Sequence, residues 1–363
     1  MINYIKKSTN IIKNDGFNIF ITRLLSYSQV RFKRLYKFKI KKETERFASL
    51  KNKYKNKRVF LLGNGPSLNK TPLHLLENEY KMCCNRFNLF YDRINWKPDF
   101  YLATDDLLIK DIHVEINKDI IPEINACFFP DIHPSNLEIK NTLIKPKDNI
   151  FWINTDRPGF TLDLPYCGIN KTVINPGLQI LSYLGFSEIY LLGMDLTFSN
   201  QNVKKHNSRN WTAQKNDDPN HFDPRYFGKG YSYHNPTEDE ILETFEEAKL
   251  FFNNHRVNIY NSTIGGKLEV FSRVDLHSLF NLDAREELML FLKQFSIYDY
   301  KSSDLTDYFD NSQKINSIEE WNENKNYVVC DTNIAITLIP KVIDNFIPYG
   351  PILGKYLFMK RKQ

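Results

Sequence analysis

The chain has 363 residues, of which 42% are hydrophobic and 14% aromatic, and this supports a globular core in one large α/β domain with extensions or in two domains. Five scattered cysteines match no metal-ligand spacing, so neither a disulfide framework nor a cysteine-based metal site is indicated, and a reducing compartment is favoured. No uninterrupted apolar run is long enough to span a bilayer, and no secretory signal is visible.

The positive net charge of +6 comes from the beginning of the chain, where residues 1–58 contain 17 Lys and Arg but only 3 Asp and Glu. We expect residues 1–57 to form a basic, amphipathic helical extension. Its basic residues alternate with aromatic ones, which suits the inner leaflet of a membrane. A solvated helix packed on the body by its apolar side is the alternative. Nucleic acid is not expected, because the body is acidic and carries no nucleic-acid motif.

A nucleotide-binding turn is the first hypothesis for the body. Residues 58–68, RVFLLGNGPSL, place a buried parallel strand before a Gly-x-Gly turn and an expected helix. Gly63 and Gly65 allow a close ligand, the helix N-terminus suits a phosphate, and Asn64 and Ser67 could add hydrogen bonds. A plain structural turn is the alternative, because the third fingerprint glycine and a Gly-Lys-Ser/Thr sequence are both missing.

Polar residues follow several further short strands. Asn85 and Arg86 end the strand predicted over 80–87, and Asp105 and Asp106 follow the strand predicted over 98–104. In an open α/β sheet these positions lie at the ligand-binding edge. The two acids could hold a metal or could cap a helix. Two more short strands are predicted, over 126–130 and 149–154.

The middle of the chain continues the α/β pattern and then departs from it. A helix ending at Gly185 leads into a strand over 187–192 that is closed by Gly193 and Asp195. Residues 196–236 are polar, aromatic and aperiodic, which is typical of a functional lid. Asn235 and Pro236 are predicted to start a helix that runs to about residue 255. A last strand, 257–261, and a tight turn, 262–266, follow.

We expect three parts: the extension 1–57, a catalytic domain 58–277 with its lid 196–236, and a helical C-terminal extension 278–363. Helices are predicted over 276–297 and 334–346, although Pro340 would kink the second.

Three stretches of the body, 62–68, 84–87 and 184–195, resemble bacterial sialyltransferases of glycosyltransferase family 42. They also resemble the domain-of-unknown-function 115 group, which includes motility-associated factors and 6-hydroxymethylpterin diphosphokinase MptE-like proteins. The resemblance covers about residues 58–275. It implies an α/β fold with a Rossmann-like, mostly parallel sheet that binds a CMP-sugar.

The resemblance also implies roles for individual residues. Asn85 would lie near the reacting sugar, His221 in the lid would be the general base, and His234 is the second choice for that base. The family's arginine before the central helix is replaced here by Asn-Pro-Gly at 175–177. The residues expected to contact the nucleotide are Gly63, Asn64, Gly65, Pro66, Ser67, Asn85, Thr104, Asn175, Gly177 and Asp195.

The leading hypothesis is therefore a bacterial, cytoplasmic glycosyltransferase, peripheral at the inner membrane. It would move a nonulosonic acid from a CMP donor to a lipooligosaccharide, capsule or O-antigen acceptor by inverting displacement. No cofactor is required, Mg²⁺ or Mn²⁺ is possible, and a homo-oligomer is possible. The alternatives are a diphosphokinase that uses ATP with a metal at Asp105, Asp106 and Asp195, and a non-catalytic membrane-associated scaffold.

Overall fold

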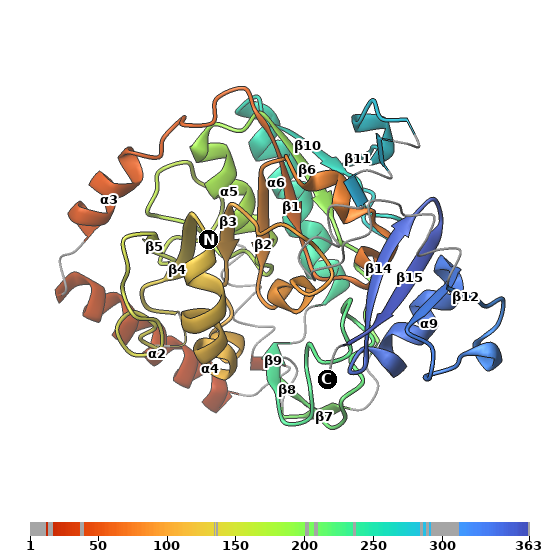
Figure 1. Ribbon diagram of the computed structural model, residues 1–363. Coiled ribbons are helices and arrows are strands. Elements are labelled where there is room, and N and C mark those ends of the chain that lie inside the picture. The colour runs from red at the N-terminus through yellow and green to blue at the C-terminus, as the bar shows by residue number, and fades with distance from the viewer. Residues whose placement is uncertain are drawn as a thin grey trace.

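A central sheet of eight parallel strands organises the molecule (Figure 1). The computed structural model describes residues 12–13, 17–36, 40–133, 135, 137–199, 203–206, 210–234, 237–283, 286–287, 290–291 and 312–361. In spatial order the strands are β11 (Ser272–Arg273), β10 (Asn258–Asn261), β6 (Glu188–Leu192), β1 (Arg58–Leu62), β2 (Lys81–Cys84), β3 (Phe100–Leu102), β4 (Ala126–Pro130) and β5 (Ile150–Ile153). The predicted mixed α/β fold with a Rossmann-like sheet is confirmed.

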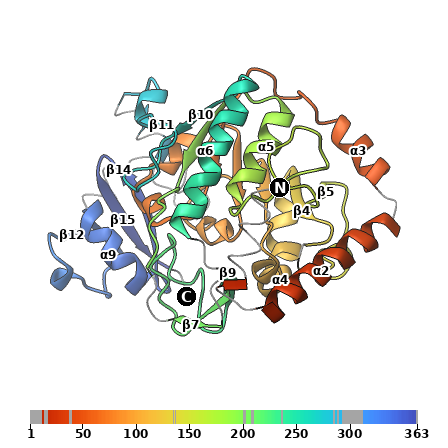
Figure 2. The same ribbon diagram turned by 180° about the vertical axis from the view of Figure 1, so that it is seen from behind.

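The two faces of the sheet carry different helices. Alternate residues of β1 show this division, because Val59 and Leu61 point into one core and Phe60 and Leu62 into the other. Figure 2 shows the first face, with α5 (Ile174–Leu184) and α6 (Glu238–Asn254) in front of the sheet and α3 (Ile40–Ala48) at the margin near β5. The second face is covered by α4 (Asp106–Glu115), its π-helical continuation Ile116–Ile120, and the 3₁₀ helices η1 (Pro66–Lys70), η2 (Leu73–Leu76), η3 (Phe87–Phe90) and η5 (Ile121–Glu123).

The chain order of the strands creates a switch point beside β1. From β1 the chain builds β2, β3, β4 and β5 in one direction, and it then returns to place β6 on the other side of β1. Crevices at the carboxyl ends of strands beside such a reversal are where open α/β sheets bind ligands. The turns that follow β1 and β6 therefore flank the expected ligand position.

The predicted lid contains a small antiparallel sheet of its own, formed by β7 (Val203–Lys205), β8 (Asn210–Ala213) and β9 (Ser232–His234). Trp211, Phe222 and Tyr226 are buried in or beneath it, so its aromatic residues form packing contacts. The predicted helix start at residues 235–236 lies outside the described residues, and α6 begins at Glu238.

The prediction of a helical C-terminal extension is wrong for most of residues 312–361, although the helix predicted over 334–346 is present from residue 332 to residue 342. These form a second sheet, in the order β12 (Gln313–Lys314), β13 (Tyr327–Asp331), β15 (Lys355–Lys360) and β14 (Phe346–Ile352), with a single long helix, α9 (Thr332–Val342), and the 3₁₀ turn η8 (Ile318–Glu320). Pro348 and Pro351 lie within β14, and prolines in a sequence usually indicate that the stretch is not a strand. However, β14 is the edge strand of this sheet, where proline is tolerated because it breaks no inner ladder.

Within the range predicted as a helix, 276–297, the structure shows a 3₁₀ turn, η6 (His277–Leu279), and helical backbone at residues 286–287 and 290–291. Residues 284–285, 288–289 and 292–297 lie outside the described part.

The N-terminal extension is helical where it is described, in α2 (Phe17–Tyr36) and α3. In Figures 1 and 2, α2 lies at the margin of the molecule beside α4. The side chains of Phe17, Leu24, Leu25 and Phe32 are 51–68% exposed. Within the described part of the chain, each helix is too short or too polar to cross a membrane.

Candidate functional site

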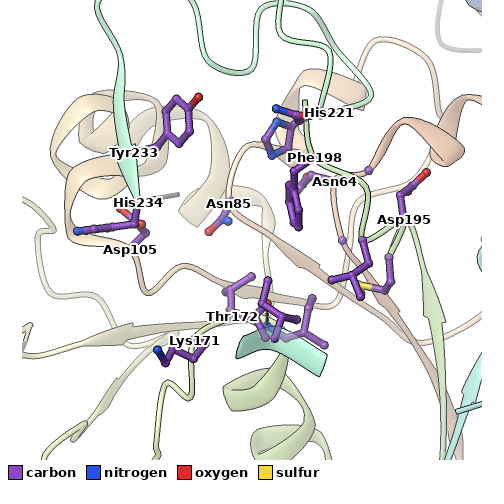
Figure 3. A pocket seen from close by; sticks show the side chains of 18 of the residues that line it. Asn64, Asn85, Asp105, Lys171, Thr172, Asp195, Phe198, His221, Tyr233 and His234 are labelled. Atoms are coloured by element: carbon purple, nitrogen blue, oxygen red, sulfur yellow. Dashed lines mark hydrogen bonds and ion pairs between the residues drawn. The ribbon is translucent and has the colours of Figure 1, made fainter. Parts of the chain in front are cut away.

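A cleft of about 450 Å³ opens at the carboxyl ends of β1, β2, β3 and β6 (Figure 3). The lid covers one side of it, and the turn before α5 forms the opposite wall. The polar side chains that line it are Asn64, Asn85, Thr104, Asp105, His133, Lys171, Thr172, Asp195, Thr197, Asn220, His221, Tyr226, Tyr233, His234, Thr237 and Glu240. The cleft therefore lies at the switch point that the strand order defines.

The glycines of the opening turn are needed for the packing of two loops. Gly65 N–H donates to Gly193 O at 3.0 Å, and a Cβ on Gly65 would lie 1.8 Å from the Asp195 carboxylate. A Cβ on Gly63 would lie 2.6 Å from the same Gly193 oxygen. Gly63 and Gly65 do line the cleft. Their lack of a side chain, however, is explained by the close approach of the β6 turn.

The prediction that a phosphate-binding helix follows this turn is wrong. It is the short 3₁₀ helix η1, and its first amide is occupied: Ser67 N–H donates to Asp195 Oδ1 at 3.0 Å, and Ser67 Oγ donates to Asp195 Oδ2 at 2.7 Å. Figure 3 shows the Asp195 side chain directed away from Asn85. Pro66 and Ser67 do not line the cleft. Burial raises the pKa of Asp195, although the Ser67 hydrogen bonds partly oppose this.

Two other predicted nucleotide-binding residues also lie outside the cleft. Asn175 is fully buried in the first turn of α5, where its Nδ2 donates to Asn170 O and Thr244 Oγ1. Gly177 packs against Leu61 of β1. Thr104, in contrast, lines the cleft. The α5 N-terminal region contributes Lys171 and Thr172 instead, which the sequence analysis did not select.

Two asparagines present unsatisfied oxygens to the cleft. Asn64 Nδ2 donates to Cys84 O at 3.1 Å, which fixes the amide orientation and leaves Asn64 Oδ1 buried without a hydrogen-bond partner among the described residues. Asn85 Oδ1 is likewise buried without such a partner. Asn85 has a left-handed backbone (φ 54°), and its N–H and C=O are bonded to Leu102 O and Tyr101 Oη. Both side chains are thus positioned to accept hydrogen bonds from a ligand.

His221 forms a dyad with an acid of the lid. Its Nδ1 lies 2.7 Å from Asp218 Oδ2, and its ring stacks on Tyr226 with centroids 3.7 Å apart. Asp218 also accepts the backbone N–H groups of Asn220 and Phe227, so its carboxylate is rigidly held. An acid bonded to Nδ1 selects the tautomer in which Nε2 can accept a proton. The predicted base is therefore in the cleft with a partner that orients it.

The lid segment that carries His221 is anchored to the body. Phe222 N–H donates to Asn64 O at 2.9 Å, and Asn69 Nδ2 donates to Phe222 O at 2.8 Å. Next in the chain, buried Asp223 accepts from Arg93 Nη2 at 2.7 Å and from Arg225. Burial alone would raise the pKa of Asp223, but the two arginines lower it overall. His221 is therefore held in place without a ligand.

The second candidate base, His234, lies on the other side of Asn85, as Figure 3 shows. Its Nδ1 is 2.8 Å from Asp105 Oδ2 and 3.9 Å from Asp106 Oδ1. These three residues form a cluster whose potential metal-ligand atoms all lie within 4.8 Å of one another. Asp195, the third predicted metal ligand, is not part of this cluster.

Sequence reasoning missed Asp218, Arg93 and Asp223. Asp218 stands three residues before His221, a spacing that allows a local carboxylate–imidazole contact and could have suggested the dyad. Arg93 offered no such signal, because its partner Asp223 is 130 residues away in the chain.

The fold is that of an α/β protein with a Rossmann-like sheet and a cleft at its switch point. The model of the family described as 6-hydroxymethylpterin diphosphokinase MptE-like matches residues 35–201, which run from the end of α2 to the start of the lid. This match confirms the resemblance to that group.

Two solved structures are similar to this chain at low identity. One is the MAf glycosyltransferase from Magnetospirillum magneticum AMB-1, with 16% identity, a TM-score of 0.39, and coverage of 71% of this chain and 41% of that one. This chain thus spans about two fifths of that protein's length. The other is the sialyltransferase CstII from Campylobacter jejuni in complex with cytidine-5'-monophosphate, with 15% identity, a TM-score of 0.37, and coverage of 63% and 89%. No curated protein matches the chain.

Proposed function

We propose that this protein is a glycosyltransferase that moves a nonulosonic acid from a CMP-sugar to a hydroxyl of a surface-glycan acceptor. The observation that carries the proposal is the His221–Asp218 dyad beside two asparagine oxygens in one cleft. Sugar hydroxyls and the cytosine amino group are hydrogen-bond donors. They could donate to the oxygens of Asn64 and Asn85, which accept no hydrogen bond from the described residues. The motif resemblance supplies the donor class.

In the proposed mechanism, His221 Nε2 removes the proton from the acceptor hydroxyl while that oxygen attacks the anomeric carbon. The bond from that carbon to the CMP phosphate oxygen breaks, and the configuration inverts. Asp218 stabilises the imidazolium that forms. Because the Ser67 amide is already bonded to Asp195, the phosphate would instead face Thr172 and the N-terminus of α5, whose dipole favours an anion.

Turnover by His221 variants tests the assignment of the base. Purified full-length protein would be given CMP-sialic acid and an oligosaccharide acceptor, and CMP release would be followed with and without the acceptor. We expect His221→Ala to lower kcat by about 10²–10⁴-fold while CMP affinity is kept. His255→Ala changes an exposed histidine at the end of α6 and serves as the matched control. Turnover of His221→Ala within a few-fold of wild type would exclude His221 as the base.

A diphosphokinase is the second candidate, favoured by the carboxylates of Asp105 and Asp106 beside the cleft and by the description of the matching family. Calorimetry with CMP, UDP, GDP and ATP, each with and without Mg²⁺, separates the candidates. Metal-independent CMP binding supports the glycosyltransferase, and ATP binding that requires Mg²⁺ supports the diphosphokinase. Binding of none of them favours the scaffold.

We further propose that the N-terminal extension holds the enzyme at the cytoplasmic face of a membrane. The exposed apolar side chains of Phe17, Leu24, Leu25 and Phe32 on α2, in a strongly basic segment, support this. Co-sedimentation with vesicles that contain an anionic lipid should fall when these four residues are changed to Ser. Vesicle binding that persists in this variant would show that the apolar side chains of α2 do not hold the protein at a membrane.

A further inference from the structure

Asp105, Asp106 and His234 bring two carboxylates and one imidazole together at the edge of the cleft. Asp105 and Asp106 begin α4 directly after β3, and His234 ends β9 in the lid. The cluster is therefore formed between the body and the lid, although His234 lies 129 residues beyond Asp105.

Each carboxylate uses one oxygen for positioning and turns the other toward His234. Asp105 Oδ1 accepts the N–H of Leu108 at 2.9 Å and caps α4, and its Oδ2 faces His234. Asp106 Oδ2 accepts from Ser135 Oγ and lies 3.4 Å from His133 Nδ1. Carboxylates oriented in this way by outer hydrogen bonds are typical of metal ligands.

The second oxygen of Asp106 gives an independent indication of a ligand. The Asp106 side chain is only 9% exposed, and its Oδ1 is buried without a hydrogen-bond partner among the described residues, 3.9 Å from His234 Nδ1. A buried carboxylate oxygen without a hydrogen bond is costly unless a cation or donor occupies the space before it. Burial alone would raise the pKa of Asp106, but His133 and Ser135 hold it well below its usual range.

We propose that Asp105, Asp106 and His234 bind one divalent cation at the edge of the cleft. An ion about 2.1 Å from each ligand atom requires only a small contraction of atoms that already lie within 4.8 Å of one another. The ion takes the place of the hydrogen bond between His234 Nδ1 and Asp105 Oδ2. Two carboxylates with one imidazole suit Mn²⁺, because carboxylates favour Mg²⁺ and Mn²⁺ and imidazole favours the later transition metals.

The site is open toward the cleft, since the side chains of Asp105 and His234 are 29% and 38% exposed and both line it. Open coordination positions are characteristic of metals that contact a substrate. The ligand class that such an ion recognises beside Asn85 is a phosphate or carboxylate oxygen. The inference does not depend on the proposed glycosyltransferase activity, because the site uses neither His221 nor Asn64.

Mn²⁺ binding to the full chain without nucleotide tests the proposal. Loss of the free Mn²⁺ signal in electron paramagnetic resonance should show one saturable site. Asp106→Asn, Asp105→Asn and His234→Gln should each weaken it by at least about tenfold. Asn is a good helix N-cap, so Asp105→Asn keeps the start of α4. The matched control is Asp111→Asn, which removes one negative charge from the same helix but not from the cluster.

Bound Mn²⁺ should also show nitrogen coupling in electron spin-echo spectra, and this coupling should disappear in His234→Gln. The proposal is overturned by the absence of saturable binding to wild type, by equal loss of affinity in Asp111→Asn, or by the absence of nitrogen coupling. If Asp106→Asn does not fold, the other two variants decide the question. CMP binding is measured separately, so the metal site and the glycosyltransferase proposal can fail independently.

Discussion

Arg93 and Asp223 form an ion pair that is sealed from solvent, with Arg93 Nη2 2.7 Å from Asp223 Oδ2 and side-chain exposures of 2% and 0%. Arg93 follows η3 in the body, and Asp223 stands two residues after His221 in the lid. Arg93 Nη1 also donates to Asn69 Oδ1, and Asn69 holds the carbonyl of Phe222. The pair therefore fixes the position of the candidate base.

Removal of Asp223 should destabilise the protein strongly. Asp223→Ala leaves the Arg93 guanidinium buried without its carboxylate, which typically costs about 3–5 kcal/mol. Urea unfolding followed by tryptophan fluorescence would measure the loss. Arg225→Gln is the control, because Arg225 is 38% exposed and its removal leaves the buried pair intact. A cost under about 1 kcal/mol for Asp223→Ala would mean that the lid is not anchored by this pair.

Gly65 should not tolerate even a methyl group. In Gly65→Ala the new Cβ would lie 1.8 Å from Asp195 Oδ2, so the β1 and β6 turns must separate, at a cost of about 1–3 kcal/mol. The melting temperature should fall, and nucleotide binding should weaken with it. Gly228→Ala is a suitable comparison, because its nearest atom is the Asn216 side-chain oxygen at 3.1 Å. An unchanged melting temperature for Gly65→Ala would contradict the packing of these turns.

Asp218→Asn should impair turnover more than substrate binding. The amide no longer fixes the His221 tautomer or stabilises the imidazolium, so we expect kcat to fall by about 10²–10⁴-fold with little change in KM. The neighbouring Asp217→Asn provides the control. Nitrogen NMR of the imidazole would report the tautomer directly. If KM rises while kcat stays unchanged, Asp218 has a structural role in substrate binding and not a role in the chemical step.

The contribution of Asp106 to stability should depend on pH. Its pKa in the folded protein is lower than the unfolded value of about 4, so its contribution is present above pH 4 and is lost as the pH falls through the folded value. Asp106→Asn should thus be less stable than wild type at pH 7, and the difference should narrow below pH 4. Unfolding at several pH values, without metal, would check this. A difference that does not vary with pH would show that the charge contributes nothing.

Strand positions and strand-end residues were predictable because buried parallel strands are short apolar runs that end in polar turns. This pattern predicted the strands that end at Gly63, Asn85 and Asp195, and these three residues lie at the same edge of the sheet. The role of residues 196–236 as a lid stays a prediction from their lack of periodicity, which gave no sign of the small sheet formed by β7, β8 and β9. His221, predicted as the general base, lines the cleft, and its catalytic role remains a prediction.

The remaining features depend on contacts between distant parts of the chain. The Ser67 amide is occupied by a carboxylate 128 residues away, which no local pattern reveals. Asn175 and Gly177 were selected from a motif position, but the rotation of α5 turns both into the core. In the C-terminal sheet, Pro348 made the edge strand β14 unrecognisable from the sequence. Local sequence identifies the elements, whereas side-chain direction and long-range partners come from packing.

The ion pair between Arg93 and Asp223 also has a consequence for folding. Its partners are separated by 130 residues, so closing this loop costs chain entropy that nearby contacts do not repay. Most strands of the parallel sheet precede the lid in the chain and can pair before Asp223 is in place. A partly folded molecule would then have an ordered sheet and an undocked lid, open to proteases. Protection of the peptide bonds around His221 from cleavage would thus report the docking of the lid onto the sheet.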